Sequence, residues 1–270
     1  MIRERIGEPV LRVEDDRLVT GRGRYGGDLV GPDCLHAVFV RSRHAHCRIE
    51  SIDASAALAL PGVVAVFTAQ DLQADGIGDI GCVTRRARAD GDRIAPAPRP
   101  VLASEIARYV GDPIALVIAE SRDQAEDAAM EIVVGDEALP AVGNLEAAST
   151  GPLVWPDVAG NRAFHLAFGD RAGVEEAFAR AHKTTRLDFG ISRVTAAPLE
   201  TRYAIARWND SAERYELTVG TQSPHLLRSE LAQVLGVSAF DVQVATPDVG
   251  GSFGLKNAAF PEHAAILWAA

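Results

Sequence analysis

Apolar and polar positions alternate in short blocks along the first half of the chain. Residues 35–40 and 63–67 are two strand-like runs, and residues 114–119 form a longer apolar run that is typical of a buried strand. Ser121 and Gln124 then form a capping-box pattern ahead of a helix with alanines at helical spacing. The pattern therefore predicts a strand–turn–helix unit in this region.

Two further segments of the first half are defined by their polar and turn residues. Asp53 is placed to cap a short helix that Pro61 and Gly62 end. Residues 73–100 are polar and rich in glycine, proline and arginine, and they lack periodicity, so we predict a long surface loop. Its arginines are interpreted as a solvated loop or a subunit contact rather than a substrate site: Arg85, Arg86, Arg88, Arg93 and Arg99.

The second half opens irregularly and then becomes more regular. Residues 139–160 are rich in proline, glycine, alanine and small polar residues, which indicates a domain boundary and predicts domains over 1–145 and 146–270. One helix is predicted over 174–181. A second has Ser223 as its N-cap, Pro224 at its first position and Gly236 past its end. Strands are predicted over 184–189, 203–207, 215–219 and 241–245.

Composition and charge narrow the classes of function. The 270 residues carry 27 Lys and Arg against 37 Asp and Glu, a net charge of −10, which disfavours nucleic acids and anionic membrane surfaces as partners. No apolar stretch approaches the length of a transmembrane helix, and Arg3, Glu4 and Arg5 stand where a signal peptide would be apolar. The expected location is therefore the cytoplasm, with no membrane insertion.

Residue types that bind metals are few and scattered. Cys34, Cys47 and Cys82 form no CxxC pair, so neither a disulfide framework nor a zinc or iron–sulfur site is indicated. His44 and His46 precede Cys47 and offer three ligand positions. Because alternate residues of a strand share one face, packing or surface roles are favoured for these histidines, and no metal site made of protein ligands is predicted.

Three glycines within five residues mark the sharpest chemical feature, residues 249–256. The segment follows a predicted strand and precedes a helix that starts at Pro261, and its glycines can turn backbone N–H groups outward as an anion-binding nest. A tight turn between strand and helix is the alternative. Since Lys256 is followed by Asn257 rather than Ser or Thr, the segment is not a Walker A loop, and a stand-alone phosphate-binding domain is a weaker hypothesis.

A second feature, residues 221–225 (Thr-Gln-Ser-Pro-His), lies at a predicted strand end and helix N-terminus. The side-chain amide of Gln222 could contact a ligand oxygen there, and the positive end of the helix favours anions. Taken alone, a helix cap with a solvated glutamine is the simpler interpretation.

Together and in this order, the two motifs resemble the molybdenum-cofactor subunit of the xanthine dehydrogenase/aldehyde oxidase family, which includes the carbon monoxide dehydrogenase large subunit. Further segments follow in family order over nearly the whole chain: 6–25, 40–49, 61–68, 108–115 and 196–202. The last of these reads Ala-Ala-Pro-Leu-Glu-Thr-Arg, where the family usually has Pro-Met/Leu-Glu-Pro. The resemblance is to the N-terminal part of a family large subunit only.

The resemblance implies an α+β fold, in which an α/β-hammerhead domain with an N-terminal lead-in precedes the first part of a molybdopterin-binding domain. It places Gln222 beside an oxygen ligand of molybdenum, as a catalytic and cofactor-binding residue. Asn257 is a substrate-facing candidate at the position where xanthine dehydrogenases have Glu, and Ser252 stands where many members have Gly. The loop is expected to approach the cofactor through its backbone, at Gly250, Gly251, Ser252, Phe253 and Gly254.

The implied function is that of a molybdenum hydroxylase component, which oxidises an aldehyde, an N-heterocycle or CO with water as the oxygen source. Molybdopterin with molybdenum, with the cytosine dinucleotide form as one option, would be shared with a second molybdopterin-domain chain. Electrons would pass to 2Fe–2S clusters on an iron–sulfur subunit and to FAD on an FAD subunit. A non-catalytic assembly or scaffold protein that retains the hammerhead fold is the alternative.

The last residues carry one more expectation. From Pro261 to Ala270 the chain shows an apolar helix pattern without a glycine, an asparagine or a basic last turn to end it. Such a helix is expected to be buried by something outside this chain. A split subunit completed by a second polypeptide, or a truncated chain, would account for it, and the isolated chain is then expected to be inactive.

Overall fold

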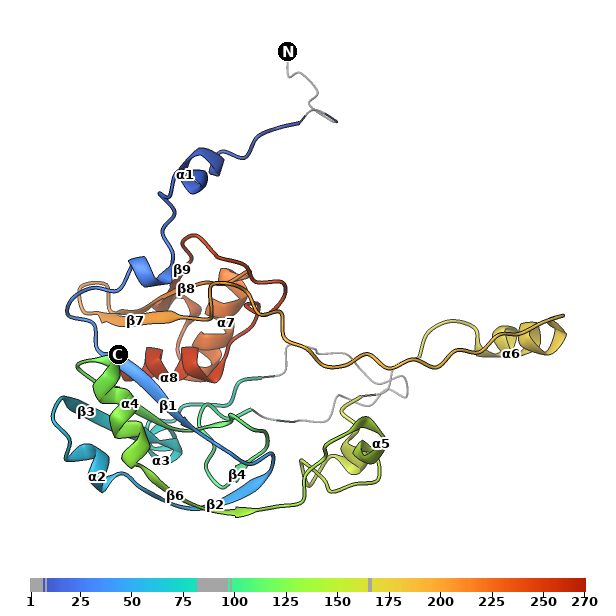
Figure 1. The fold of residues 1–270 in the computed structure, drawn as a ribbon, viewed down its shortest axis with the longest axis horizontal. Coiled ribbons are helices and arrows are strands. Elements are labelled where there is room, and N and C mark those ends of the chain that lie inside the picture. Colours follow the sequence, from blue (N-terminus) through green and yellow to red (C-terminus); the bar gives the residue numbers. More distant parts are fainter. Residues whose placement is uncertain (1–6, 8, 82–96, 98, 165–166) are drawn as a thin grey trace.

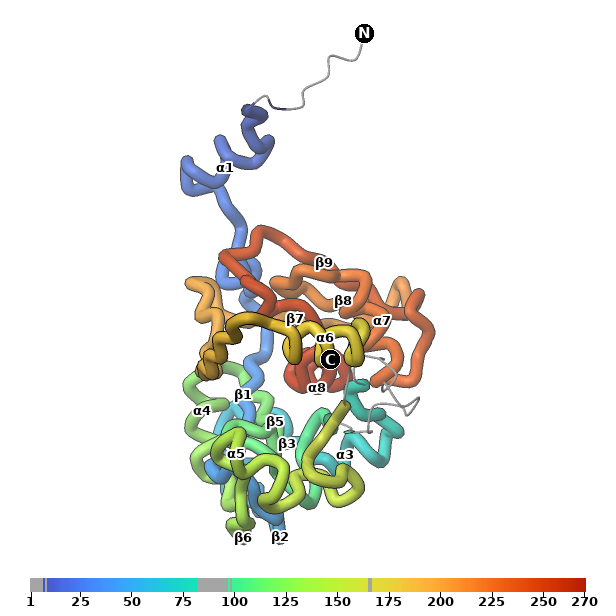
Figure 2. The backbone as a smooth tube through the Cα atoms, turned by 90° about the vertical axis from the view of Figure 1, so that its right-hand side faces the viewer, coloured from blue at the N-terminus to red at the C-terminus, as the bar shows by residue number. Residues whose placement is uncertain are grey.

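The computed structural model describes residues 7, 9–81, 97, 99–164 and 167–270. Within that part of the chain the fold is α+β, as predicted, with helices packed against three three-stranded sheets (Figure 1). None of the helices formed there has the length and apolar character of a membrane span. The N-terminal lead-in, with α1 at Asp15–Val19, extends away from the sheets (Figure 2).

The first sheet has the order β1-β5-β3, with β1 at His36–Arg41, β5 at Pro113–Ala119 and β3 at Val63–Thr68. Strand β5 is antiparallel to both neighbours and its residues are almost all buried, because it is the central strand and lies under helix α4 (Arg122–Glu131). Ser121 caps α4, since its Oγ accepts from Gln124 N at 3.3 Å. The predicted strand–turn–helix unit is confirmed.

The second sheet, β4-β2-β6, consists of Ile106–Ala107, Cys47–Asp53 and Val133–Ala138, all antiparallel. Strand β2 leads into α2 (Ser55–Leu58), where the Asp53 carboxylate accepts from Ser55 N at 2.9 Å. The predicted cap on this short helix is therefore formed by Asp53, one residue before the position that the backbone assigns to the N-cap.

The prediction of a surface loop over 73–100 is wrong at both ends of that segment, where the chain forms regular or paired structure. Helix α3 (Ala69–Ala74) begins before it, capped by Thr68, and buries Leu72. Ile80 pairs with Arg99 in an isolated bridge, and the Arg99 guanidinium donates to the Ala259 carbonyl at 2.9 Å. Arg99 is thus used inside the chain, because the bridge turns it toward the C-terminal segment; the other four arginines of the predicted patch lie outside the described residues.

The third sheet has the order β7-β8-β9, formed by Ala204–Asn209, Arg214–Val219 and Val242–Ala245. Strands β8 and β9 are parallel and are joined through helix α7 (Pro224–Leu235), whose end is closed by Gly236 in the left-handed conformation with φ 69°. Three of the strands predicted in the second half are confirmed. Ser223 is the N-cap residue of α7 but accepts no capping bond; its hydroxyl donates to Asn257.

A continuous apolar core joins the first and third sheets. It contains Leu72 and Leu116 from the first half and Leu217, Leu231 and Leu267 from the second half. Helix α8 (Pro261–Ala269) belongs to this core, with Ala264, Ala265 and Leu267 fully buried. The expectation that this helix needs burial from outside the chain is therefore wrong, since α7 and the third sheet already cover its apolar side chains.

Residues 139–203 run mostly outside the core. Short helix α5 (Leu145–Ala148) precedes α6 (Arg171–Arg180), which confirms the helix predicted over 174–181 and projects away from the sheets (Figure 1). The strand predicted over 184–189 does not form, because those residues have no partner strand in the described structure.

Candidate cofactor-binding site

The glycine-rich loop and the Thr-Gln segment meet in the folded chain. The loop occupies irregular residues 246–260 between β9 and α8, and the Thr-Gln segment lies between β8 and α7. Gln222 Oε1 accepts from Ser252 Oγ at 2.6 Å and from Gly254 N at 3.0 Å, and Gln222 N donates to Lys256 O at 2.8 Å. Two motifs about thirty residues apart in sequence therefore form one site.

The glycines of the loop serve different purposes. Gly251 and Gly254 have φ of 96° and 89°, in the region that side chains disfavour. A Cβ at Gly254 would meet nothing within 4 Å, so the backbone there is open to an approaching ligand. A Cβ at Gly250 would lie 2.5 Å from Glu200 Cβ. A glycine at position 250 is therefore required for packing inside the chain.

Phe253 is the most unusual residue of the loop. Its φ is 51°, a conformation that costs a bulky residue free energy and that clusters at functional sites. Its side chain is nevertheless 79% exposed, so no burial within the described chain offsets that cost. This combination is consistent with a side chain that is positioned for a ligand or for another part of a larger protein.

A buried ion pair supports the loop from beneath. Lys256 Nζ lies 2.9 Å from Glu200 Oε2, and the Lys256 side chain is only 1% exposed. The Glu200 carboxylate also accepts from Gly250 N at 2.9 Å and from Gly26 N at 3.2 Å. Burial alone would raise the pKa of Glu200, but the bond from Lys256 and the two backbone donors outweigh it and lower that pKa.

Glu200 and Lys256 support the site but are not predicted as site residues from the sequence. Lys256 lies in the glycine-rich motif and Glu200 in the family-like segment 196–202. One sequence feature could have indicated the pair: each of the two family-like motifs contains a charged residue of opposite sign. Glu200 is acidic and lies in 196–202, and Lys256 is basic and lies in the loop motif. Sequence separation hid the pairing.

The N-terminal lead-in reaches the same loop. Arg17 forms an ion pair with Asp248, with Nη2 to Oδ1 at 2.7 Å, and Arg24 N donates to the same carboxylate at 2.7 Å. The bond from Arg17, aided by the one from Arg24, lowers the pKa of Asp248 to about 2. The lead-in therefore holds the start of the loop from outside, while Glu200 holds it from inside.

Asn257 lies at the end of the loop, next to the Thr-Gln segment. Its side chain is exposed, and its Oδ1 accepts from Ser223 Oγ at 2.8 Å. The structure thus places Asn257 one residue from the backbone contact between Lys256 and Gln222. Asn257 is thus an exposed residue joined by a hydrogen bond to the Thr-Gln segment.

The histidine pair of the first domain has partners within the protein. His44 Nε2 lies 3.4 Å from Asp136 Oδ1, and His46 Nδ1 lies 2.9 Å from the Pro140 carbonyl. Cys47 is fully buried, with its Sγ 3.6 Å from Ser42 Oγ. No cluster of three metal-binding side chains occurs among the residues that the structure describes.

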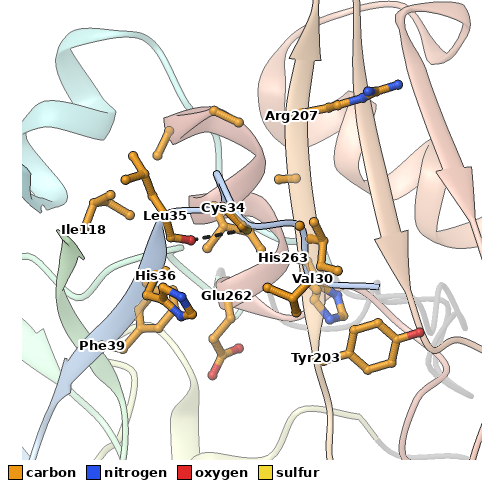
Figure 3. Close-up of a pocket in the computed structure, with 18 of the residues that line it drawn as sticks. Val30, Cys34, Leu35, His36, Phe39, Ile118, Tyr203, Arg207, Glu262 and His263 are labelled. Atoms are coloured by element: carbon orange, nitrogen blue, oxygen red, sulfur yellow. Dashed lines mark hydrogen bonds between the residues drawn. The ribbon is translucent and has the colours of Figure 1, made fainter. Parts of the chain in front are cut away.

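A cavity of about 950 Å³ lies elsewhere, between β1, β7 and α8 (Figure 3). Cys34, His36, Tyr203 and Glu262 are among its lining residues, and Glu262 pairs with Arg41 at 2.8 Å. Neither Gln222 nor the loop lines this cavity. This cavity is therefore separate from the candidate site, whose residues Gln222, Phe253 and Gly254 are exposed.

Comparison with known proteins matches both parts of the chain. Residues 20–140 match the aldehyde oxidase and xanthine dehydrogenase a/b hammerhead domain, and residues 154–270 match the molybdopterin cofactor-binding domain. The structure also resembles quinoline 2-oxidoreductase from Pseudomonas putida 86, with a TM-score of 0.84 and 38% identity over 95% of this chain and 32% of that one. The expected hammerhead domain and start of a molybdopterin-binding domain are confirmed.

Curated relatives are enzyme subunits. The chain is 39% identical to the nicotine 6-hydroxylase large subunit of Paenarthrobacter nicotinovorans, over 96% of this chain and 31% of the relative. It is 33% identical to the carbon monoxide dehydrogenase large chain of Afipia carboxidovorans, over 92% of this chain and 31% of the relative. The chain thus spans about a third of the length of the curated relatives it matches.

Proposed function

Because the chain belongs to the aldehyde oxidase and xanthine dehydrogenase family, we propose that it forms part of the molybdopterin-binding large subunit of a molybdenum hydroxylase. The observation that carries the proposal is the contact of Gln222 with Ser252 and Gly254, which joins the two family motifs into one exposed site. The relatives named above are all subunits of enzymes, which favours this function over a scaffold role.

The donor set of the site fits a cofactor rich in oxygen atoms. Gln222 is exposed, and its Oε1 is occupied by two donors, so its NH₂ group is the end available to a ligand. The backbone at Gly254 is open on its Cβ side, and Phe253 is exposed. When bound, the molybdenum cofactor would supply the two-electron oxidation chemistry, and the Gln222 NH₂ group would donate to one of its oxygen atoms.

The proposed residues divide into two groups. Gln222, Gly251, Phe253 and Gly254 would contact the cofactor, through one side-chain amide and an accessible stretch of backbone. Gly250 and Ser252 would support them from behind, because Gly250 packs against Glu200 and Ser252 is 8% exposed with its hydroxyl bonded to Gln222. This division refines the larger contact set that the resemblance implies.

The substrate we propose is an N-heterocycle, with an aldehyde or CO as the other classes. Two of the more similar proteins are named for nicotine and quinoline, which supports the heterocycle. Asn257 is the proposed substrate-facing residue. Its amide can donate hydrogen bonds through the NH₂ group, whereas an ionised carboxylate at this position could only accept them. A neutral amide suits a substrate that presents a hydrogen-bond acceptor, such as an aromatic nitrogen.

The proposed complex contains more than this chain. We propose the division 1–145 for the hammerhead domain with its lead-in and 146–270 for the first molybdopterin-binding domain, completed by further molybdopterin-domain sequence. Relatives named as a large subunit or large chain support partner subunits. The proposed partners are an iron–sulfur subunit with 2Fe–2S clusters and an FAD subunit, with molybdopterin in its cytosine dinucleotide form, in the cytoplasm.

Gln222→Ala in the purified complex tests this function. A positioned donor that acts on charge developing in the transition state is worth on the order of a hundred- to a thousand-fold in turnover. We therefore expect turnover per bound molybdenum to fall by about that factor, with molybdenum measured separately as metal content. Gln233→Ala, at an exposed position on α7, is the matched control. If Gln222→Ala alters neither molybdenum content nor turnover per molybdenum, the proposed role fails.

A further inference from the structure

The two ends of the Gln222 side-chain amide are in different environments. Its oxygen accepts from Ser252 Oγ at 2.6 Å and from Gly254 N at 3.0 Å. Its NH₂ group makes no hydrogen bond within the described part of the chain, and the residue is exposed. A backbone N–H can only donate a hydrogen bond. The Gly254 N–H can therefore bond to the amide oxygen but not to the amide NH₂ group.

The Ser252 hydroxyl also has a defined hydrogen-bond partner on each side. It is buried, with 8% of its surface exposed, and its Oγ accepts from Lys256 N at 3.0 Å. With that donor in place, the single hydroxyl hydrogen of Ser252 is free to point at Gln222 Oε1. Turning the amide round would set its NH₂ group against the Gly254 N–H and lose that bond, and the Ser252 hydroxyl could then no longer donate to the amide oxygen.

We propose that Ser252 is a positioning residue that fixes Gln222 as an outward hydrogen-bond donor. Its hydroxyl, together with Gly254 N, holds the amide oxygen to the loop, so that the NH₂ group faces the exposed side of the site. The atom that Gln222 recognises is therefore an acceptor, such as an oxygen, and not a donor. That this acceptor belongs to the cofactor rests on the proposed function. The orientation of the amide rests on the hydrogen bonds alone.

The support for Ser252 comes from the same frame that carries the loop. Lys256, whose backbone N–H bonds Ser252, is held by Glu200 through a buried ion pair. Lys256 O in turn accepts from Gln222 N and from Thr221 Oγ1. The serine is thus held in place by Lys256 on one side and contacts the glutamine on the other, which limits the freedom of both.

Side-chain amide relaxation in the 270-residue chain tests this orientation directly. The sequence contains six glutamines, so glutamine-labelled protein gives few NH₂ signals, and the Gln222→Ala spectrum identifies the one from Gln222. We expect the Gln222 NH₂ group to be as rigid as the backbone in the native chain. In Ser252→Ala it should become as mobile as that of an exposed glutamine such as Gln73, and Ser252→Thr, which keeps the hydroxyl, should restore rigidity.

The control and the opposing result are equally direct. Ser229→Ala removes an exposed hydroxyl on α7 that donates to the His225 carbonyl, and it should leave Gln222 unchanged. A rigid Gln222 amide in Ser252→Ala, in a chain whose backbone spectrum remains native, would overturn the proposal. If Ser252→Thr does not fold, a native Ser252→Ala spectrum with an unchanged amide still decides against it.

The complex separates this inference from the proposed function. We expect Ser252→Ala to lower turnover per molybdenum by about tenfold, the effect of one lost hydrogen bond, and less than Gln222→Ala does. If Gln222→Ala has no effect in the complex while Ser252→Ala still mobilises the amide, the proposed function fails and the positioning role of Ser252 stands. If the amide stays rigid, the positioning role fails whatever the complex shows.

Discussion

The glycine-rich loop and the segment 167–197 are both irregular for most of their length. They differ in whether other parts of the chain supply hydrogen-bond partners. The loop is bonded by Arg24, Glu200 and Gln222, residues from three distant parts of the chain. The segment 167–197 projects from the sheets around α6 (Figure 1). It carries exposed apolar side chains, among them Phe168, Leu187 and Ile191. Irregular backbone is well defined where its polar groups find partners within the chain.

The same contrast explains two strand predictions. The sequence predicts strands over both 114–119 and 184–189. The first became β5 because β1 and β3 supply hydrogen-bond partners on both edges. The second has no such neighbours among the described residues, and its apolar side chains remain exposed. A strand is therefore a property of the pairing as much as of the sequence.

The largest expected effect concerns the ion pair beneath the loop. Glu200→Ala leaves Lys256 charged with a side chain that is 1% exposed, and removing one partner of a buried pair costs about 3–5 kcal/mol. We expect that loss in the free energy of unfolding, measured by chemical denaturation. The matched variant is Glu175→Ala, whose 2.8 Å pair with Arg171 is on the surface of α6 and should be worth about 0.5 kcal/mol or less.

A double variant sharpens this first comparison. Glu200→Gln combined with Lys256→Met removes both charges, and it should recover much of the stability lost in Glu200→Ala, because no buried charge is left without a partner. Equal losses for Glu200→Ala and Glu175→Ala would show that the loop is supported no better than the projecting helix.

The second effect is a dependence of stability on pH. His263, at the start of α8, is 5% exposed, and burial, helped by the charge of Arg202, lowers its pKa from 6.5 to about 4. Between those values the unfolded chain binds a proton that the native chain does not, so stability rises with pH. The free energy of unfolding should therefore fall by about 3 kcal/mol from this group as the pH drops from 6.5 to 4.

Comparison of pH profiles isolates that contribution. His263→Gln removes the titrating ring while keeping an acceptor for Phe260 N, which bonds the His263 ring at 3.3 Å. Its unfolding free energy should depend less on pH between 6.5 and 4 than that of the native chain. His182→Gln, at an exposed position just after α6, is the control. Parallel profiles for the native chain and His263→Gln would refute the assignment.

Much of the site could be predicted because its motifs are local. The helix between Pro224 and Gly236 follows from a short sequence pattern, and the resemblance implies that the Thr-Gln segment and the loop lie at one cofactor. The Glu200–Lys256 pair and the bond from the lead-in to Asp248 could not be predicted, because they join residues 56 and 231 positions apart and only the folded chain brings them together.

The burial of α8 shows a different limit. The missing cap and the apolar composition of this helix predict that it needs burial by something outside this chain, but both features describe the helix alone. Leu267 and its neighbours are instead buried by a core that residues from the first half, such as Leu72 and Leu116, help to form. Composition indicates that a surface must be covered, and it does not identify what covers it.

The smallest expected effect compares one substitution at two places. Ile114→Val in β5 removes a methylene group from a side chain that is 1% exposed, and such a loss in a packed core costs about 0.5–1.5 kcal/mol. Ile191→Val makes the same change at a side chain that is 86% exposed, where we expect an effect within about 0.5 kcal/mol. Both are conservative for strand propensity, so the difference in unfolding free energy reports burial alone. If Ile191→Val destabilised the 270-residue chain as much as Ile114→Val, the segment around Ile191 would be packed in solution, through another copy or another part of the chain. A concentration-dependent unfolding midpoint for the native chain, absent in Ile191→Val, would then identify the packing as association between copies.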